Sequence, residues 1–543
     1  MRSARPFWLT LGAIMAGALA LRVWGTSVGL PYVYNVDEGA HFVPRAVGMF
    51  DHDYDPGYFI NPPGLTYLLH GLLWLRWGGD ETRQLVFEDP GAVFAYARVS
   101  VAVLATLAVG LIAWVGTRLF DRRVALVAAA LLAVAFLPVH YGHFALNDAA
   151  LLVPVCLSLA GAAGILAKGR LRDYLLAGLA LGVAAAFKYT AGIVLVPLLA
   201  AAVLAPTPWR TRLGGVAVAL VASLAGFLAL NPYALLSFDE FRGALNEQSA
   251  ASSDTGGKLG LELIHPLRYY LETLGWGLGI VPVVVATAGG VALALRHLRI
   301  ALLLIPAPLL FFAFMGSQER FFARWALPVY PFIILLAAWG AVRLLERVPR
   351  VGPAVVVGVA ALALGAQGLV YSVHNDTVLT LPDTREDARE WMLANIPAGA
   401  QVVIEPIAPD AWSEPWVKRA TSHFRVNENG NTTPLPAPKL EDYERTLRPY
   451  LIGAYRRSGD CWVVTGSILS GRPFVTPDRA PYAIKYYRAL ERRAERVFAI
   501  SPLAEGAKEP PFSFDDSYNW RPLSYTRPGP RIVIYRLRGG RCA

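Results

Sequence analysis

The chain has 543 residues, of which 55% are hydrophobic and only 17% are charged, and its mean hydropathy is +0.42. Soluble globular proteins carry roughly 25% charged residues, so the composition excludes an ordinary soluble protein and predicts a polytopic α-helical membrane protein. The formal net charge of +10 does not indicate nucleic-acid binding, because many Lys and Arg residues lie in short loops between apolar segments, as membrane topology requires.

The first apolar segment covers residues 7–25 and follows two arginines. A cleaved signal peptide would fit this charged start and the Ala18-Leu19-Ala20 sequence. The apolar run continues through Leu21-Arg22-Val23-Trp24, however, and further apolar segments follow. We therefore expect an uncleaved first transmembrane helix.

Ten more apolar segments follow, and they approach the roughly 20 residues that a helix needs to cross a bilayer. They lie at 94–117, 124–139, 149–167, 174–187, 189–205, 213–230, 273–295, 300–315, 326–342 and 352–371. The sequence therefore predicts about eleven transmembrane helices.

The segment 62–78 is shorter and holds Trp74, Arg76 and Trp77, residue types that suit a membrane interface. If this helix lies on the membrane and the amino terminus is cytoplasmic, every inner loop has at least two cations, as the positive-inside rule requires. In this arrangement the protein lies in a cell membrane, and its carboxyl terminus is extracytoplasmic. The polar segments that share this outer face are 26–93, 140–148, the turn at Lys188, 231–272 and 316–325.

The composition changes after Tyr371, where charges, Pro and Gly become frequent. Helical spacing occurs at 384–396 and 480–495, and strand-like runs occur at 401–405, 461–465 and 531–535. Helices that alternate with strands indicate an α/β domain. We therefore predict a transmembrane domain at 1–372 and an extracytoplasmic α/β domain at 373–543.

Cys461 and Cys542 both lie in this second domain. A disulfide between them requires an extracytoplasmic location, and two free thiols fit the sequence equally well. Cys156 lies in an apolar run and is expected to be inert. Asn431 begins a glycosylation sequon in a Pro-rich loop at 427–438, which is a weak signal.

Acidic residues mark two of the outer segments. Asp37 and Glu38 follow the first helix, and Asp148 precedes the segment 149–167. Acids at a membrane face are costly and suggest function, although helix capping in a solvated loop is the simpler explanation for each of them.

Three cations accompany these acids. Lys188 interrupts an otherwise apolar stretch, and Arg320 and Arg324 flank Phe321-Phe322 at the outer end of a span. Snorkelling explains such a lysine without any function. Together the three cations predict an anion site at the outer surface, where a lipid phosphate is the expected anion.

Carboxylates and cations together at an outer face suit sugar transfer from a lipid phosphate. The cations stabilise the phosphate as it leaves, and a carboxylate removes the proton of the acceptor hydroxyl. A second carboxylate steadies the charge on the sugar or holds a metal. Only Asp37 and Asp148 are candidates for a metal, and no His/Cys ligand spacing supports one.

The chain resembles the membrane glycosyltransferases that use lipid-linked sugars, the GT-C class that includes protein O-mannosyltransferases and lipid A aminoarabinose transferases. The resemblance covers roughly residues 1–372 and depends on the order of its motifs. These are Asp37-Glu38-Gly39-Ala40-His41, Pro62-Pro63, Asn147-Asp148-Ala149, Phe187-Lys188-Tyr189-Thr190 and the run from Arg320 to Pro331.

The resemblance implies that Asp37 is the base, that Glu38 supports it, and that Asp148 is the acid of the second outer loop. It implies that Lys188 and Arg320 face the phosphate of an undecaprenyl- or dolichyl-type carrier, with inversion at the sugar. The second domain resembles the variable outer domains of many members.

One departure from the family is clear, because aminoarabinose transferases have Glu-Lys where this chain has Ile60-Asn61. This weakens a lipid A assignment, and Arg45 or Arg324 would have to supply the missing charge. The remaining candidates for substrate or phosphate binding are His41, His143 and Asn147.

We therefore predict a glycosyltransferase that uses a polyprenyl-phosphate sugar and a glycan, lipid or protein acceptor. No cofactor beyond a possible divalent cation is expected. The alternatives are a transporter or flippase of lipid-linked saccharides and a non-catalytic envelope scaffold. The clustering of polar groups at one face argues against a transport pathway through the bilayer.

Overall fold

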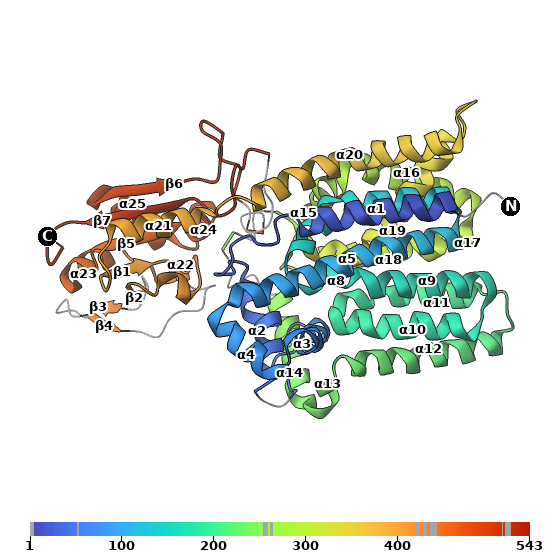
Figure 1. Cartoon of the computed structure of the whole chain (residues 1–543), viewed down its shortest axis with the longest axis horizontal. Helices are drawn as coiled ribbons and strands as arrows, with labels where there is room; N and C mark the ends of the chain where they lie inside the picture. Colours follow the sequence, from blue (N-terminus) through green and yellow to red (C-terminus); the bar gives the residue numbers. More distant parts are fainter. Residues whose placement is uncertain are drawn as a thin grey trace. The chain divides into compact units, whose positions relative to one another are not determined.

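The computed structural model describes residues 5–51, 54–253, 259–260, 264–419, 424–426, 432–434, 443–512, 514–515 and 523–542. The chain forms two compact units (Figure 1). The first contains 1–26, 37–252 and 266–376, and the second contains 27–36, 253–265 and 377–543. Two short segments before residue 373 thus belong to the second unit. The chain passes from the first unit to the second for the last time after Asp376.

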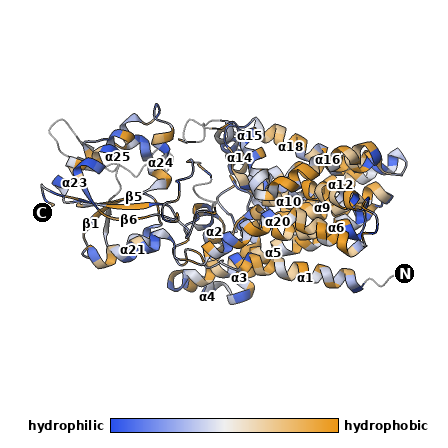
Figure 2. Ribbon diagram, turned by 90° about the horizontal axis from the view of Figure 1, so that it is seen from above, coloured by the Kyte–Doolittle hydropathy of each residue, from blue (hydrophilic) through white to orange (hydrophobic). Residues whose placement is uncertain are grey.

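The first unit is a bundle of apolar helices, and Figure 2 shows that hydrophobic residues predominate along them. The apolar helices of the bundle are α1 (Arg5–Val23), α5 (Pro90–Leu119), α6 (Arg122–Val134), α9 (Leu152–Lys168), α10 (Leu171–Phe187), α11 (Leu195–Leu204), α12 (Trp209–Ala229), α16 (Ile280–Arg296), α17 (Leu298–Leu304), α18 (Pro306–Gly316), α19 (Tyr330–Leu345) and α20 (Pro353–Leu379). Connecting helices are α2 (Val43–Gly48), α3 (Gly64–Trp77), α4 (Gly79–Glu88), α7 (Phe136–His140), α8 (Asn147–Ala150), α13 (Tyr233–Leu236), α14 (Phe238–Ser253) and α15 (Pro266–Leu274).

Within the described residues, eight helical segments are long and apolar enough to cross a membrane, or nine if the bent segments 122–134 and 136–143 form one span. The other two predicted spans correspond to α10, which has 17 residues, and to the shorter apolar segment Tyr189–Leu204. The predicted polytopic helical fold is confirmed, and the number of eleven spans stays a prediction.

The bend of 58° between α6 and α7 explains the arginine in the first apolar segment. The end of α6 leaves backbone carbonyls without helical partners, and these groups are costly inside a membrane. The buried Arg22 donates to the carbonyls of Leu132 and Ala133 at 3.0 Å, and Ser372 donates to Val134 at 3.1 Å. The chain can therefore turn here toward the loop that carries Asp148.

The predicted interfacial helix at 62–78 is the helix α3. Its 14 residues rise about 21 Å, which is less than the roughly 30 Å of a hydrocarbon core. Gly64 lets α3 pack tightly against the end of α10, because a Cβ at this position would lie 2.5 Å from the carbonyl oxygen of Ala186.

The second unit contains a five-stranded sheet with the strand order β2-β1-β5-β7-β6. Strands β1 (Gln401–Ile404), β2 (Val417–Arg419) and β5 (Trp462–Gly466) are parallel, whereas β7 (Ile532–Leu537) pairs antiparallel with both β5 and β6 (Ala494–Ile500). The register places Val403 opposite Val463. A separate hairpin pairs β3 (Phe424–Val426) with β4 (Thr432–Pro434).

Helices cover both faces of this sheet. The helix α21 (Thr384–Asn395) lies on one side, and α23 (Leu451–Ser458), α24 (Ser467–Val475) and α25 (Pro481–Arg493) lie on the other (Figure 2); α22 is the short helix Tyr443–Thr446. Val402, Val464 and Ile534 are among the buried core residues. The predicted α/β class is confirmed, whereas β2, β3, β4 and β6 were not predicted. Asn431 and most of the predicted loop 427–438 lie outside the described residues.

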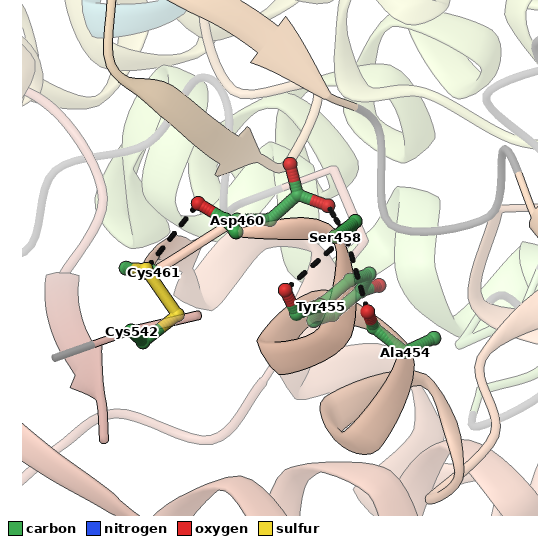
Figure 3. The surroundings of a disulfide bond; sticks show 7 residues. Ala454, Tyr455, Ser458, Asp460, Cys461 and Cys542 are labelled. Carbon is green, nitrogen blue, oxygen red and sulfur yellow. Dashed lines mark hydrogen bonds between the residues drawn. A yellow bond between two sulfur atoms is a disulfide. The ribbon is translucent and has the colours of Figure 1, made fainter. Parts of the chain in front are cut away.

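A disulfide joins Cys461 to Cys542, whose Cα atoms lie 5.3 Å apart (Figure 3). The backbone N–H of Leu537, the last residue of β7, donates to the carbonyl of Cys461 at 2.8 Å. Disulfides persist in oxidising compartments, so this bond fits an extracytoplasmic second unit. Cys156 is buried and carries a free thiol.

Candidate functional site

Four charged side chains from distant parts of the first unit form one chain of ion pairs. Arg324 donates to Asp37 at 2.6 Å, and its Nε atom lies 3.6 Å from Oδ2 of Asp148. The ammonium group of Lys188 donates to the other oxygen of Asp148. The structure therefore brings together two acids and two cations that the sequence predicts for one face.

Each of the four residues lies where a helix begins or breaks. Asp37 precedes a turn of π-helix at Glu38–Phe42, and Asp148 lies in the first turn of α8. Lys188 has extended backbone between α10 and a 3₁₀ segment, and Arg324 lies in the 3₁₀ segment Ala323–Val329 before α19. Breaks let side chains from different helices point toward a common centre.

Exposure distinguishes the two acids. The side chain of Asp37 is 34% exposed, whereas that of Asp148 is 3% exposed. Lys188 and Arg324 are largely buried, at 10% and 14%. Asp37 is therefore the carboxylate that a molecule arriving from solvent can reach, and Asp148 is the counterion that keeps two buried cations paired.

Neighbouring cations set the ionisation of Asp37. Burial raises the pKa of this carboxyl group, but the positive charges around it outweigh that effect and lower the pKa below its ordinary value. Arg324 contributes most to the lowering, followed by His41, Arg320 and Lys188. Asp37 is thus ionised at neutral pH and able to accept a proton.

Glu38 forms a separate buried pair with Arg98. The carboxylate of Glu38 is fully buried and receives two hydrogen bonds from Arg98, each of 2.8 Å. It also accepts the backbone N–H of Ala145 at 2.8 Å, while Arg98 donates to the carbonyl of Thr26 at 2.6 Å. Glu38 therefore ties the segment after α1 to α5 and to the loop before Asp148.

The predicted binding residues of that loop face other partners. The Asn147 side chain donates to the carbonyl of Phe187 at 2.6 Å. His143 is buried, with Nε2 lying 2.9 Å from the carbonyl of Trp24 and 3.2 Å from the carboxylate of Asp376. Both side chains thus hold the loop in place, and neither lies in the Asp37–Arg324–Asp148–Lys188 chain.

His41 and Tyr58 lie close enough to Asp37 for electrostatic interaction, and Arg45 contacts Tyr58. The rings of His41 and Tyr58 stack with centroids 4.5 Å apart, and the guanidinium of Arg45 lies 4.4 Å from the Tyr58 centroid. Arg45 also donates to the carbonyl of Pro56 at 2.6 Å. Arg320 is close enough to influence the pKa of both Asp37 and Tyr58.

Sequence reasoning missed Arg98 and Tyr58. Arg98 is a cation near the start of an apolar helix, which is the same signal that identified Lys188. Tyr58 has no comparable signal, because an aromatic residue in a polar loop is common.

The cluster does not fit a metal ion. Asp37 and Asp148 are bridged by Arg324, a cation that occupies the place between them. Across the parts of the chain that the structure describes, no group of three or more His, Cys, Asp or Glu residues is arranged to hold a metal. We therefore assign no step to a metal here.

Comparison with known proteins agrees with this architecture. Residues 85–235 match the model of the dolichyl-phosphate-mannose-protein mannosyltransferase family. No curated protein sequence matches the chain.

Two solved structures illustrate the shared fold. The oligosaccharyltransferase of Archaeoglobus fulgidus is 14% identical, with 91% of this chain and 73% of that chain covered at a TM-score of 0.52. ArnT from Cupriavidus metallidurans, bound to undecaprenyl phosphate, is 16% identical, with 98% of each chain covered and a TM-score of 0.52. The family match is confined to residues 85–235, and the two structures show that the fold is shared.

Proposed function

We propose that this membrane glycosyltransferase transfers a sugar from a polyprenyl-phosphate carrier to an acceptor hydroxyl at the extracytoplasmic face of a cell membrane. The observation that carries this proposal is the convergence of Asp37, Arg324, Asp148 and Lys188.

The charge of the cluster suits a phosphodiester. Arg324, Arg320 and Lys188 all lie close enough to Asp37 to lower the pKa of its carboxyl group. A sugar linked to a polyprenyl monophosphate carries one negative charge, which such cations attract. Arg324 suits this contact, because a guanidinium has five N–H donors and binds carboxylate and phosphate oxygens alike.

The transfer then follows from these positions. Asp37 accepts the proton of the acceptor hydroxyl, whose oxygen forms a bond to the anomeric carbon of the sugar. The bond between that carbon and the phosphate oxygen breaks, and the electron pair leaves with the phosphate. Lys188 and the two arginines stabilise the charge that develops on the leaving phosphate.

Two further observations support the carrier and the face. The similar ArnT structure contains undecaprenyl phosphate, and a second structure from A. fulgidus, of AglB, contains a dolichol-phosphate. The Cys461–Cys542 disulfide and the distribution of Lys and Arg support an extracytoplasmic second unit.

A donor panel tests the reaction. The purified protein in liposomes should release polyprenyl monophosphate from at least one polyprenyl-phosphate sugar when an acceptor extract is present. Arg324→Gln should strongly reduce this release, whereas Arg268→Gln, which removes an exposed cation paired with Glu272, should not. Movement of intact donor across the bilayer without release would show a flippase and overturn the proposal.

The orientation has its own test. Val36 is exposed and precedes Asp37, and the native cysteines are either buried or in a disulfide. Val36→Cys should react with an impermeant maleimide in intact cells. Reaction only after permeabilisation would contradict the proposed face.

A further inference from the structure

The ten residues before Asp37 do not belong to the first unit. The chain leaves that unit after Thr26, passes through the second unit at 27–36, and returns at Asp37. The side chains of Tyr32 and Tyr34 pack against the core of the second unit. The backbone that leads into the candidate base is therefore held by the second unit.

Two arginines of α21 form cation–π contacts with these tyrosines. The guanidinium carbon of Arg385 lies 3.7 Å from the ring centroid of Tyr34, and that of Arg389 lies 5.2 Å from the ring of Tyr32. The arginines are four positions apart on one face of the helix, and the tyrosines are two positions apart on the segment. The two contacts thus fix both the position and the direction of residues 32–34.

The arginines are themselves oriented by the second unit. Asp383 accepts two hydrogen bonds from the Arg385 side chain, at 2.8 and 2.7 Å, and Arg385 also donates to the carbonyl of Ile407 at 3.2 Å. Arg389 donates to the carbonyl of Trp412 at 2.8 Å. A preorganised guanidinium makes a more rigid cation–π contact than a mobile one.

The backbone between the two tyrosines is strained. Val33 has φ of +52°, a left-handed conformation that β-branched residues rarely adopt. Gly29 also has positive φ, and a Cβ there would lie 2.5 Å from the Tyr34 ring. Strain of this kind persists only where surrounding contacts enforce it, and it concentrates at functional sites.

We propose that Tyr32 and Tyr34, which form cation–π contacts with Arg389 and Arg385, are positioning residues. Through them the second unit holds the backbone that leads into Asp37 and so determines the position of this carboxylate. We call this set the tyrosine clamp. The inference rests on the proposed function, because it gives the clamp a role only if Asp37 takes part in the reaction. The second unit then affects catalysis by positioning Asp37. This effect differs from any binding of substrate by that unit.

A spin label reports on the clamp without any activity. A nitroxide attached to Val36→Cys should be immobile in the parent protein and in Tyr34→Phe, which keeps the aromatic ring, and mobile in Tyr34→Leu. Tyr482→Leu is the matched control, because it removes a cation–π pair with Arg448 on the same unit and should leave the label immobile. An immobile label in Tyr34→Leu would overturn the clamp.

Kinetics then test positioning. The proteins without the label are assayed with polyprenyl-phosphate sugars extracted from the source membranes. Tyr34→Leu should lower kcat about ten- to hundred-fold, as expected for a displaced catalytic group, with little change in KM for the donor. Tyr34→Phe and Tyr482→Leu should retain the parent kcat. Unchanged kcat in a variant with a mobile label would refute the positioning role.

The same series separates this inference from the proposed function. If Asp37→Asn transfers sugar at the parent rate, Asp37 is not the base and the proposed role fails, whatever the label shows. If Asp37→Asn is inactive and Tyr34→Leu is fully active, only the clamp's role in catalysis fails. Equal losses of kcat in Tyr34→Leu and Tyr34→Phe would also overturn it, because the ring contact would then be irrelevant.

Discussion

Arg324 donates to Asp37 over a distance of 2.6 Å, although 287 positions separate the two residues in the chain. The same guanidinium approaches Asp148, so one side chain joins the two acids and is the largest contributor to lowering the pKa of Asp37. The proposed base and phosphate ligand are therefore electrostatically coupled.

This coupling predicts a shifted pH profile. A base acts when deprotonated, and the lowered pKa of Asp37 keeps transfer active to a lower pH than an ordinary carboxyl group would. Loss of Arg324 should raise that pKa, because Arg324 contributes most to lowering it. The acid limb of residual kcat/KM in Arg324→Gln should therefore move to higher pH, with Arg268→Gln as the unshifted control. An unmoved limb would show that Asp37 is not the titrating base.

Glu38 is expected to act through stability. Glu38→Gln leaves the buried charge of Arg98 without its carboxylate, and breaking such a pair costs about 3–5 kcal/mol. Thermal unfolding in detergent should show a large loss of stability for this variant. Glu272→Gln, which removes an exposed pair with Arg268, should cost no more than about 1 kcal/mol. Equal effects of the two variants would contradict the structural role.

A double variant of Asp148 and Lys188 should regain stability without regaining activity. Asp148→Asn alone leaves the buried Lys188 without its carboxylate and should destabilise the protein by about 3–5 kcal/mol. The double variant Asp148→Asn/Lys188→Met removes both charges and should recover most of this loss. It should remain inactive, because Lys188 is proposed to bind phosphate. Recovered transfer in the double variant would exclude that role.

The buried carboxyl group of Glu405 should make the stability of the second unit depend on pH. Burial raises the pKa of this carboxyl group to about 8, against hydrogen bonds from Tyr487 and Gly466 that lower it. Between pH 4.5 and 8 the folded state holds a proton that the unfolded state has released. Stability should therefore fall by about 1.4 kcal/mol per pH unit across this window as pH rises.

Glu405→Gln tests this slope, because glutamine is neutral and can accept from Gly466 and donate to the Tyr487 oxygen. The variant should unfold with less pH dependence between 4.5 and 8 and gain stability over the parent as pH rises. Glu491→Gln, on the same unit, serves as the control. A parent slope that persists in Glu405→Gln would assign the titration to another group.

Much of the fold follows from the sequence because its signals are local. Long apolar runs mark the helices of the first unit, and the change in composition after Tyr371 marks most of the second. The π-turn after Asp37 and the clamp on residues 27–36 could not be predicted, because both depend on contacts with residues far along the chain. Spacing alone likewise could not join Cys461 to Cys542.

The site shows the same division. Asp37, Asp148, Lys188 and Arg324 were predicted from charges at one membrane face, where their desolvation cost makes them informative. The partner of each charge was not predictable, since Glu38 pairs with Arg98 and Asp148 pairs with Lys188 across helices. For this reason the sequence placed Glu38 and Asn147 among the site residues, whereas their contacts hold the surrounding segments together.

The most direct measurement is sugar transfer by purified Asp37→Asn with a defined polyprenyl-phosphate sugar, beside Asp55→Asn as a matched acid of the same outer segment. Loss of a general base typically costs about 10²–10⁴ in rate. We predict a kcat reduced by that factor in Asp37→Asn, with normal folding and carrier-phosphate binding, and a parent rate in Asp55→Asn. Transfer by Asp37→Asn at the parent rate would contradict the account.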